Sequence, residues 1–185
     1  MTFVDLVEKR GQPPRIMVIG VGGAGGNAVN RMIDADMVGI EFAAVNTDEQ
    51  ALERCRAQQR IQIGRQATRG LGSGGNPELG RRAIQESEEE ITAALQGTDM
   101  VYIAAALGGG TGTGASPCIA RLARAQEILT VAVVSTPFRF EGAVRQRQAE
   151  EGLAELENEV DGIIVVANER LLELVPPQTS LSEAF

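Results

Sequence analysis

The run from Leu107 to Ala115, Leu-Gly-Gly-Gly-Thr-Gly-Thr-Gly-Ala, constrains this chain more than any other stretch of it. It follows an apolar run, Met100–Ala106, and precedes a helix-like run, Ala115–Gln126. Because glycine loses the most backbone freedom on ordering, we predict a loop here rather than the interior of a helix or strand. Backbone N–H groups that approach an anion such as phosphate at a helix N-terminus would explain this loop. The alternative is a flexible turn.

A second glycine-rich run follows the first apolar segment of the chain. We predict a strand over Arg15–Gly20, a glycine-rich turn over Gly20–Asn27 and a helix over Ala28–Ala35, the beginning of a nucleotide-binding β-α unit. The turn matches the dinucleotide fingerprint at Gly20, Gly22 and Gly25, and either Glu41 or Asp48 follows at the spacing of a ribose-binding acid. The same glycines would also suit close packing of a helix on a strand.

Strands and helices are predicted to alternate along the rest of the chain. Further strands are expected at Ile40–Val45, Arg60–Gly64, Met100–Ala106, Ile128–Val134 and Gly162–Ala167. Helices are expected near Glu49 and over Pro77–Leu95, Ala115–Gln126 and Ala143–Val160. This alternation predicts a doubly wound α/β fold, a mostly parallel sheet of about six strands with helices on both faces. Its ligand site would lie along the carboxyl ends of the strands.

Two polar segments are candidates for that edge of the sheet. Asn46-Thr-Asp48 follows a predicted strand, where its side chains would contact a ligand, or Asn46 or Thr47 would cap the next helix. The segment Thr68–Glu78 is a third glycine-rich loop, in which Asn76-Pro77 predicts a helix cap with proline in the first turn.

Composition narrows the class of protein. The chain has 185 residues, 43% of them hydrophobic, so we expect one domain over 15–185 with residues 1–14 as an N-terminal arm. A net charge of −8 disfavours a nucleic-acid partner. No apolar run is long enough for membrane insertion and no signal peptide is recognisable, so a cytoplasmic protein is expected.

Histidine is absent, which excludes Ser-His and Cys-His nucleophile systems and disfavours most zinc sites. Cys55 and Cys118 are expected to be reduced thiols. At the other end of the chain, Ser180 and Glu183 form a capping-box pattern, so the sequence stops one turn into a helix. We therefore expect a fragment of a longer protein.

The glycine-threonine run Gly108–Gly114, together with five other segments, resembles the tubulin/FtsZ superfamily, and within it the bacterial cell-division GTPases. The other segments are Gly20–Met32, Val45–Leu52, Thr68–Glu78 and Thr136–Gly142, and Asn168–Leu172 also fits. The resemblance implies a Rossmann-like GTP-binding domain that ends at the start of a central helix, with the C-terminal domain absent. It also implies GTP or GDP and Mg²⁺ as ligands, the metal being held through phosphates and water.

The resemblance further implies a role for each residue of a site. The phosphates would be held by Gly22, Gly23, Ala24, Gly25, Gly26 and Asn27 and by Gly108, Gly109, Gly110, Thr111, Gly112 and Thr113. Asn46 and Asp48 would lie near the terminal phosphate and magnesium, and Gly72, Gly74 and Gly75 would close over the γ-phosphate. The sugar would lie beside Thr136, Pro137, Glu141 and Arg145, and guanine beside Asn168 and Phe185.

Four of these residues have simpler alternatives. Glu141 and Arg145 could form an ordinary i,i+4 ion pair, Asn168 could cap a helix, and Phe185 could pack in the core. The position that corresponds to the family's guanine-binding aspartate lies beyond Phe185, and Ser135-Thr136 stands where many relatives carry a basic residue. We expect the first departure to weaken base specificity, and we interpret the second as tolerable variation.

In the superfamily, hydrolysis is completed by a neighbouring subunit's catalytic loop in a head-to-tail filament. No complete catalytic set is therefore expected in this chain, which should bind GTP with little turnover. Expected partners are other copies of the chain and cell-division proteins at the division site. Two other functions remain open, a dinucleotide-binding oxidoreductase domain and a paralogue that binds GTP without hydrolysing it.

Overall fold

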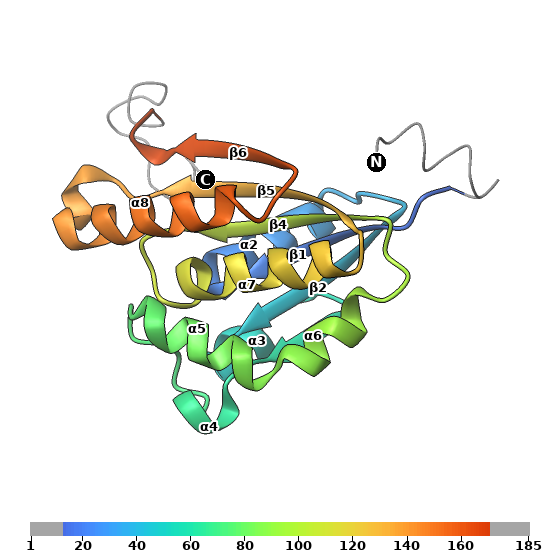
Figure 1. The fold of residues 1–185 in the computed structure, drawn as a ribbon, viewed down its shortest axis with the longest axis horizontal. Coiled ribbons are helices and arrows are strands. Elements are labelled where there is room, and N and C mark those ends of the chain that lie inside the picture. Colours follow the sequence, from blue (N-terminus) through green and yellow to red (C-terminus); the bar gives the residue numbers. More distant parts are fainter. Residues whose placement is uncertain (1–12, 171–185) are drawn as a thin grey trace.

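The computed structural model describes residues 13–170, in which a six-stranded sheet lies between two layers of helices (Figure 1). The strands are β1 (Ile16–Val21), β2 (Ile40–Asn46), β3 (Gln59–Gln62), β4 (Met100–Ala106), β5 (Leu129–Thr136) and β6 (Gly162–Ala167). All neighbouring strands pair in parallel, in the order β3-β2-β1-β4-β5-β6. This confirms the predicted doubly wound sheet. The order of connection reverses between β1 and β4, which is where open α/β sheets bind ligands.

The helices follow the strands in the expected alternation. They are α2 (Gly22–Asp34), α3 (Glu49–Glu53), α4 (Arg65–Thr68), α5 (Pro77–Glu86), α6 (Glu88–Leu95), α7 (Thr111–Ala125) and α8 (Ala143–Glu157). Two short 3-10 helices, η1 (Arg139–Glu141) and η2 (Asn168–Arg170), follow β5 and β6. In Figure 1, α5, α6, α7 and α8 lie in front of the sheet and α2 lies behind it. The predicted arrangement of helices on both faces is therefore confirmed.

Alternating side chains of the strands build two separate cores. On β1, Met17, Ile19 and Val21 belong to the large core beneath α7, whereas Val18 belongs to the smaller core beneath α2. This period of two is what an extended strand buried on both faces requires. The sheet is therefore fixed from both sides, and the carboxyl ends of β1, β4 and β5 are held in register.

Both glycine-rich runs are more helical than we predicted. The first helix begins at Gly22 and not at Ala28, and α7 begins at Thr111, so Gly112 and Gly114 lie in its first turn. The prediction of a loop over the whole of Leu107–Ala115 was therefore wrong in its second half. These glycines lie in a helix because its first turn packs too closely on neighbouring backbone for a side chain to fit. A Cβ atom on Gly112 would lie 2.5 Å from the carbonyl oxygen of Ala106, and one on Gly114 would lie 2.0 Å from that of Pro77.

The predicted helix Pro77–Leu95 is broken at Ser87 into α5 and α6. The Ser87 hydroxyl accepts a hydrogen bond from the N–H of Gly64 at 3.3 Å, which ties the break to the turn before α4. Helix α4 itself was not predicted, and α8 ends at Glu157, three residues before the predicted end at Val160. Only the last of these differences lies at an element boundary, where assignments commonly differ by a few residues.

Candidate functional site

A cavity of about 230 Å³ lies at the carboxyl ends of β1, β4 and β5. Its wall consists of backbone and small side chains, with one ion pair and one buried amide. The lining residues are Val21, Gly23, Ala24, Ser73, Ala106, Leu107, Gly109, Gly110, Thr111, Gly112, Ser135, Thr136, Pro137, Glu141, Arg145 and Asn168. The cavity therefore lies at the edge of the sheet where the sequence predicted a ligand.

Two helices begin at this cavity, and neither has a side-chain cap. The residues that precede α2 and α7, Val21 and Gly110, make no side-chain hydrogen bond to the first turn, and neither first turn contains an acidic residue. Gly23 and Ala24 of α2 and Thr111 and Gly112 of α7 line the cavity. The first N–H groups of a helix have no intrahelical partner and carry partial positive charge, so both helix starts favour an anion.

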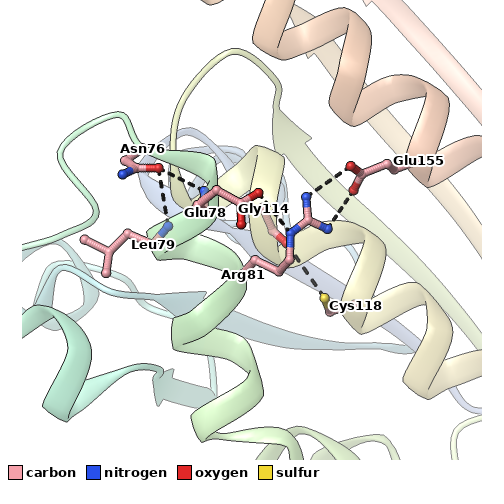
Figure 2. Close-up of polar contacts among 7 residues, drawn as sticks. All are labelled: Asn76, Glu78, Leu79, Arg81, Gly114, Cys118 and Glu155. Carbon is pink, nitrogen blue, oxygen red and sulfur yellow. Dashed lines mark hydrogen bonds and ion pairs between the residues drawn. The ribbon is translucent and has the colours of Figure 1, made fainter.

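Two neighbouring helices are capped by side chains. Asp48 accepts a hydrogen bond from the N–H of Ala51 at 3.0 Å and caps α3. Asn76 accepts from Glu78 and Leu79 and caps α5, with Pro77 in the first turn, which confirms the predicted cap (Figure 2). The prediction that Asn46 or Thr47 caps α3 was wrong, since Asp48 takes that position. Helices α4, α6 and α8 also lack a side-chain cap, so what distinguishes α2 and α7 is that glycines of their uncapped first turns line the cavity.

The glycines of the two helix starts fall into two groups. Gly25 lies against the sheet, since a Cβ there would be 2.4 Å from the carbonyl oxygen of Ala104, and Gly114 lies against α5 in the same way. A Cβ on Gly23 or Gly109, in contrast, would meet no atom within 4 Å. The first group permits close backbone packing. The second leaves backbone open to the cavity.

The ion pair and the buried amide of the cavity come from the β5 and β6 end of the sheet, whereas the hydroxyls of Ser73 and Thr111 come from the loop before α5 and from α7. Glu141 accepts hydrogen bonds from Arg145 at 2.6 Å and from the N–H of Phe138 at 2.9 Å. The i,i+4 ion pair that we considered as an alternative is therefore present, and both of its members line the cavity. Asn168 is 8% exposed, and its Oδ1 atom has no hydrogen-bond partner among residues 13–170. Its side chain makes no helix cap and can accept a hydrogen bond from a ligand.

The structure brings together about half of the predicted site residues. Those that line the cavity are Gly23, Ala24, Gly109, Gly110, Thr111, Gly112, Thr136, Pro137, Glu141, Arg145 and Asn168. Those that do not are Gly25, Asp48, Gly72, Gly74, Gly75, Gly108 and Thr113. Thr113 instead accepts a hydrogen bond from the N–H of Gly108 at 2.9 Å, which shapes the loop. Phe185 lies outside the described residues.

The remaining predicted residues line a second cavity, of about 190 Å³, between α2, β2 and α3. They are Gly22, Gly26, Asn27 and Asn46, and Cys55 lies beside them. Glu41 lies at the opposite end of β2, where it forms an ion pair with Arg15 at 2.8 Å. The interpretation of Glu41 as a ribose-binding acid was therefore wrong.

Sequence reasoning missed five residues of the first cavity: Val21, Ser73, Ala106, Leu107 and Ser135. Four of them directly precede or follow a predicted segment, and their small or apolar side chains gave no chemical signal. Ser73 was surrounded by predicted glycines and carries a hydroxyl, which was a usable signal.

Behind the cavity, one ion pair joins α5 to α8 across α7. Arg81 of α5 contacts both carboxylate oxygens of Glu155 on α8, at 2.8 and 3.1 Å, across the surface of α7 (Figure 2). Cys118 of α7 lies beneath this pair, and burial raises the pKa of its thiol. The thiol is therefore protonated at neutral pH. The bidentate pair fixes α5, and with it the end of the preceding loop, against α7 and α8.

The family model of the tubulin/FtsZ GTPase domain matches residues 15–176 of this chain. The chain belongs to the tubulin/FtsZ family. Members of this family are GTPases, and the cavity at the uncapped helix starts is consistent with GTP binding. Membership of a GTPase family also decides against the oxidoreductase alternative.

Solved structures of the tubulin/FtsZ family are similar to this chain over most of its length. An empty FtsZ dimer from M. jannaschii is 46% identical, with a TM-score of 0.90 over 98% of this chain and 53% of its own. A GTPγS-bound protofilament of CetZ2 from Haloferax volcanii is 28% identical, with a TM-score of 0.82 over 92% of this chain and 53% of its own. A GDP-bound monomer of CetZ1 from the same organism is 26% identical, with a TM-score of 0.82 over 91% of this chain and 54% of its own. The chain thus spans about half the length of these proteins.

In residues 13–170, no group of three or more His, Cys, Asp or Glu side chains is placed to hold a metal ion. Within the same residues, no helix has the length and apolar character needed to cross a bilayer.

Proposed function

We propose that this chain is the guanine-nucleotide-binding domain, residues 15–185, of a polymerising GTPase of the FtsZ type. The observation that carries the proposal is the pair of uncapped helix starts, α2 and α7, at one cavity. Two such starts suit the successive phosphates of a nucleotide. The Asn168 Oδ1 atom, buried and without a partner among the described residues, would accept a hydrogen bond from the guanine N–H edge.

Magnesium would be bound mainly by the nucleotide. The described residues offer no cluster of carboxylates for direct coordination, and the Oδ1 atom of Asp48 is already used to cap α3. This suits a hard cation that keeps several waters and binds through phosphates. Asp48 would then act through a water molecule.

Hydrolysis would be completed by a neighbouring subunit. Phosphoryl transfer depends on positioning and on stabilisation of developing charge, and the cavity wall has no carboxylate other than Glu141, which is paired with Arg145. The matched FtsZ and CetZ structures, about twice as long, include a dimer and a protofilament. We therefore propose head-to-tail self-association, with the catalytic loop outside residues 1–185.

The cellular role would be formation of the cytokinetic ring in bacterial cell division, in the cytoplasm at the division site and with other cell-division proteins as partners. The greater identity to FtsZ than to CetZ supports this role. A paralogue that binds GTP without hydrolysing it would share every residue of the cavity described above.

Calorimetric titration of the purified chain with GTP, GDP, ATP and NAD in magnesium tests the proposal. We expect binding of both guanine nucleotides, much weaker binding of ATP and NAD, and negligible turnover. Replacement of Asn168 by Ala should reduce the preference for GDP over ADP, and Asn158→Ala, on the surface beyond α8, is the matched control. Tight NAD binding without preference for guanine would contradict the proposal.

A further inference from the structure

The second cavity, of about 190 Å³ between α2, β2 and α3, has a wall of unusual charge. Its buried part is formed by Ala44, Val45, Leu52 and Cys55. None of its lining residues is acidic, although the chain as a whole has a net charge of −8. The side chain of Arg54 therefore supplies the charge of this wall, and that charge is positive.

Arg54 directly follows α3, and its guanidinium group is free to bind a ligand. The group makes no hydrogen bond and no ion pair with any of residues 13–170. The neighbouring Arg56, in contrast, forms an ion pair with Asp34 and donates to the carbonyl oxygen of Asn30 at 3.1 Å. The two arginines are two residues apart, yet only Arg54 lines the cavity.

Asn46, at the end of β2, leaves a second donor open in the same wall. Its side chain is only 6% exposed, and its Oδ1 atom accepts a hydrogen bond from the N–H of Asp48 at 3.2 Å. This bond fixes the orientation of the amide, and the Nδ2 atom donates to no residue of the described part of the chain. Because buried polar groups nearly always have hydrogen-bond partners, this Nδ2 group indicates a ligand in the cavity.

The start of α2 adds backbone donors and joins the two cavities. Gly22 and Gly23 lie in the uncapped first turn, where N–H groups have no intrahelical partner, and both line the second cavity. Gly23 also lines the first cavity, and a Cβ on it would meet no atom within 4 Å. A small ion can therefore reach the second cavity from the first past Gly23.

We propose that the second cavity binds free inorganic phosphate, at a site separate from that of the nucleotide. Arg54 supplies the charge, and Asn46 Nδ2 and the start of α2 supply hydrogen bonds, so every group that faces the ion is a donor. The cavity has room for the ion and several waters, since one water needs only about 15 Å³. Under the proposed function, hydrolysis releases this ion at the first cavity. Its source therefore rests on the proposed function, whereas the site rests on the second cavity alone.

Titration of the GDP-saturated chain with inorganic phosphate tests the inference, at an ionic strength kept constant with chloride. GDP occupies the first cavity, so that phosphate cannot bind there. We expect saturable changes in the amide signals of the Asn46 side chain and of the Gly22 N–H, and none when chloride alone is varied. The absence of a saturable change at Asn46 would overturn the inference.

Arg54→Gln should weaken phosphate binding about tenfold, as expected for a lost hydrogen bond between charged groups, and change GDP affinity less than about twofold. The matched control is Arg56→Gln, which removes the same charge two residues away, outside the cavity. It should change phosphate affinity less than about twofold. Equal losses in the two variants would assign the effect to overall charge and overturn the inference, as would no loss in Arg54→Gln.

Asn46→Asp gives an independent measurement. The variant keeps an acceptor for the N–H of Asp48 but replaces the Nδ2 donor by a negatively charged oxygen. It should weaken phosphate binding by more than about tenfold, because a donor is lost and a like charge is added. Unchanged phosphate affinity in this variant would show that the ion does not lie beside Asn46, and would overturn the inference.

A final arm separates free phosphate from the nucleotide's own terminal phosphate, near which the family resemblance places Asn46. The chain is saturated with a non-hydrolysable GTP analogue, methylene-bridged between its β- and γ-phosphates, and then titrated with phosphate. We expect phosphate still to bind. Loss of phosphate binding would assign the cavity to the terminal phosphate and overturn a separate site. A chain that binds phosphate through Arg54 but binds no guanine nucleotide would overturn the proposed function and support this inference.

Discussion

The chain passes from strand to helix through glycines at two neighbouring points, β1 to α2 and β4 to α7, and the two junctions are held differently. The first packs on the sheet, because Gly20 and Gly25 bring the start of α2 against its own strand and against Ala104. The second packs on its own strand and also on another helix, because Gly112 lies against Ala106 of β4 and Gly114 brings α7 against Pro77 of α5. Gly110 there also lies against Ser73 of the preceding loop.

This difference separates a fixed half of the cavity from an adjustable half. The close contacts of Gly20 and Gly25 at the β1 to α2 junction are all made within α2 and the sheet. The β4 to α7 junction is coupled through α5 and Ser73 to a loop with few other contacts, so that side of the cavity can respond to what is bound. Each junction also keeps one glycine, Gly23 or Gly109, with open space beside it.

The largest effect is expected from Gly114→Ala. The added methyl would lie 2.0 Å from the carbonyl oxygen of Pro77, a backbone atom that cannot move without shifting α5. We expect a loss of about 3 kcal/mol in the free energy of unfolding, the upper part of the range for overpacking. Urea unfolding of the variant and the parent chain measures this loss. A stability equal to that of the parent chain would show that α5 and α7 are not tightly packed.

The next effect compares two glycines of α2. Gly25→Ala should lose about 2 kcal/mol, because its methyl would lie 2.4 Å from the carbonyl oxygen of Ala104. Gly23→Ala should gain up to about 1 kcal/mol, the difference in helix propensity, because nothing lies nearby. Thermal unfolding of the pair checks the opposite signs. Equal changes would remove the distinction between packing glycines and open glycines.

Gly109→Ala tests the open glycine of the second junction. Its φ is not positive, so alanine fits the backbone, and stability should change by less than about 0.5 kcal/mol. A methyl at this position would obstruct approach of a phosphate to the N–H groups of the loop. We expect about tenfold weaker GDP binding, or about 1.4 kcal/mol, in a calorimetric titration. Unchanged affinity would show that the phosphate does not approach this side of the loop.

The smallest effect sharpens the contrast between capped and uncapped helices. Asn76→Ala removes the cap of α5 and should cost about 1 kcal/mol of stability without changing GDP affinity. Unfolding and titration of the same preparation check both values. A large loss of affinity with little loss of stability would instead assign Asn76 to the nucleotide site.

The sequence was sufficient to predict the sheet, its parallel pairing and the edge that carries the cavity. These follow from apolar strands alternating with amphipathic helices, and from glycines that follow two of the strands. Asn76-Pro77 also predicted its cap correctly, because capping depends on residues close in sequence.

Helix starts and cavity walls were less predictable. Helices begin at Gly22 and Thr111, and the glycines of their first turns pack closely on Ala104 and Pro77, which only the folded chain brings near. For the same reason Ser73 was missed and Glu41 was misassigned, since Ser73 reaches Thr111 and Glu41 reaches Arg15 across the fold. The roles assigned to the predicted nucleotide-binding residues stay predictions.

The central claim is that the uncapped starts of α2 and α7 bind phosphate, and amide chemical shifts on addition of GDP test it most directly. The account predicts the largest changes at the N–H groups of Gly23 and Ala24 and of Gly109–Gly112. It predicts small changes at Ala51 and Leu79, whose N–H groups are already bonded to the caps Asp48 and Asn76. Changes centred on the capped helices, or no change at either uncapped start, would contradict it.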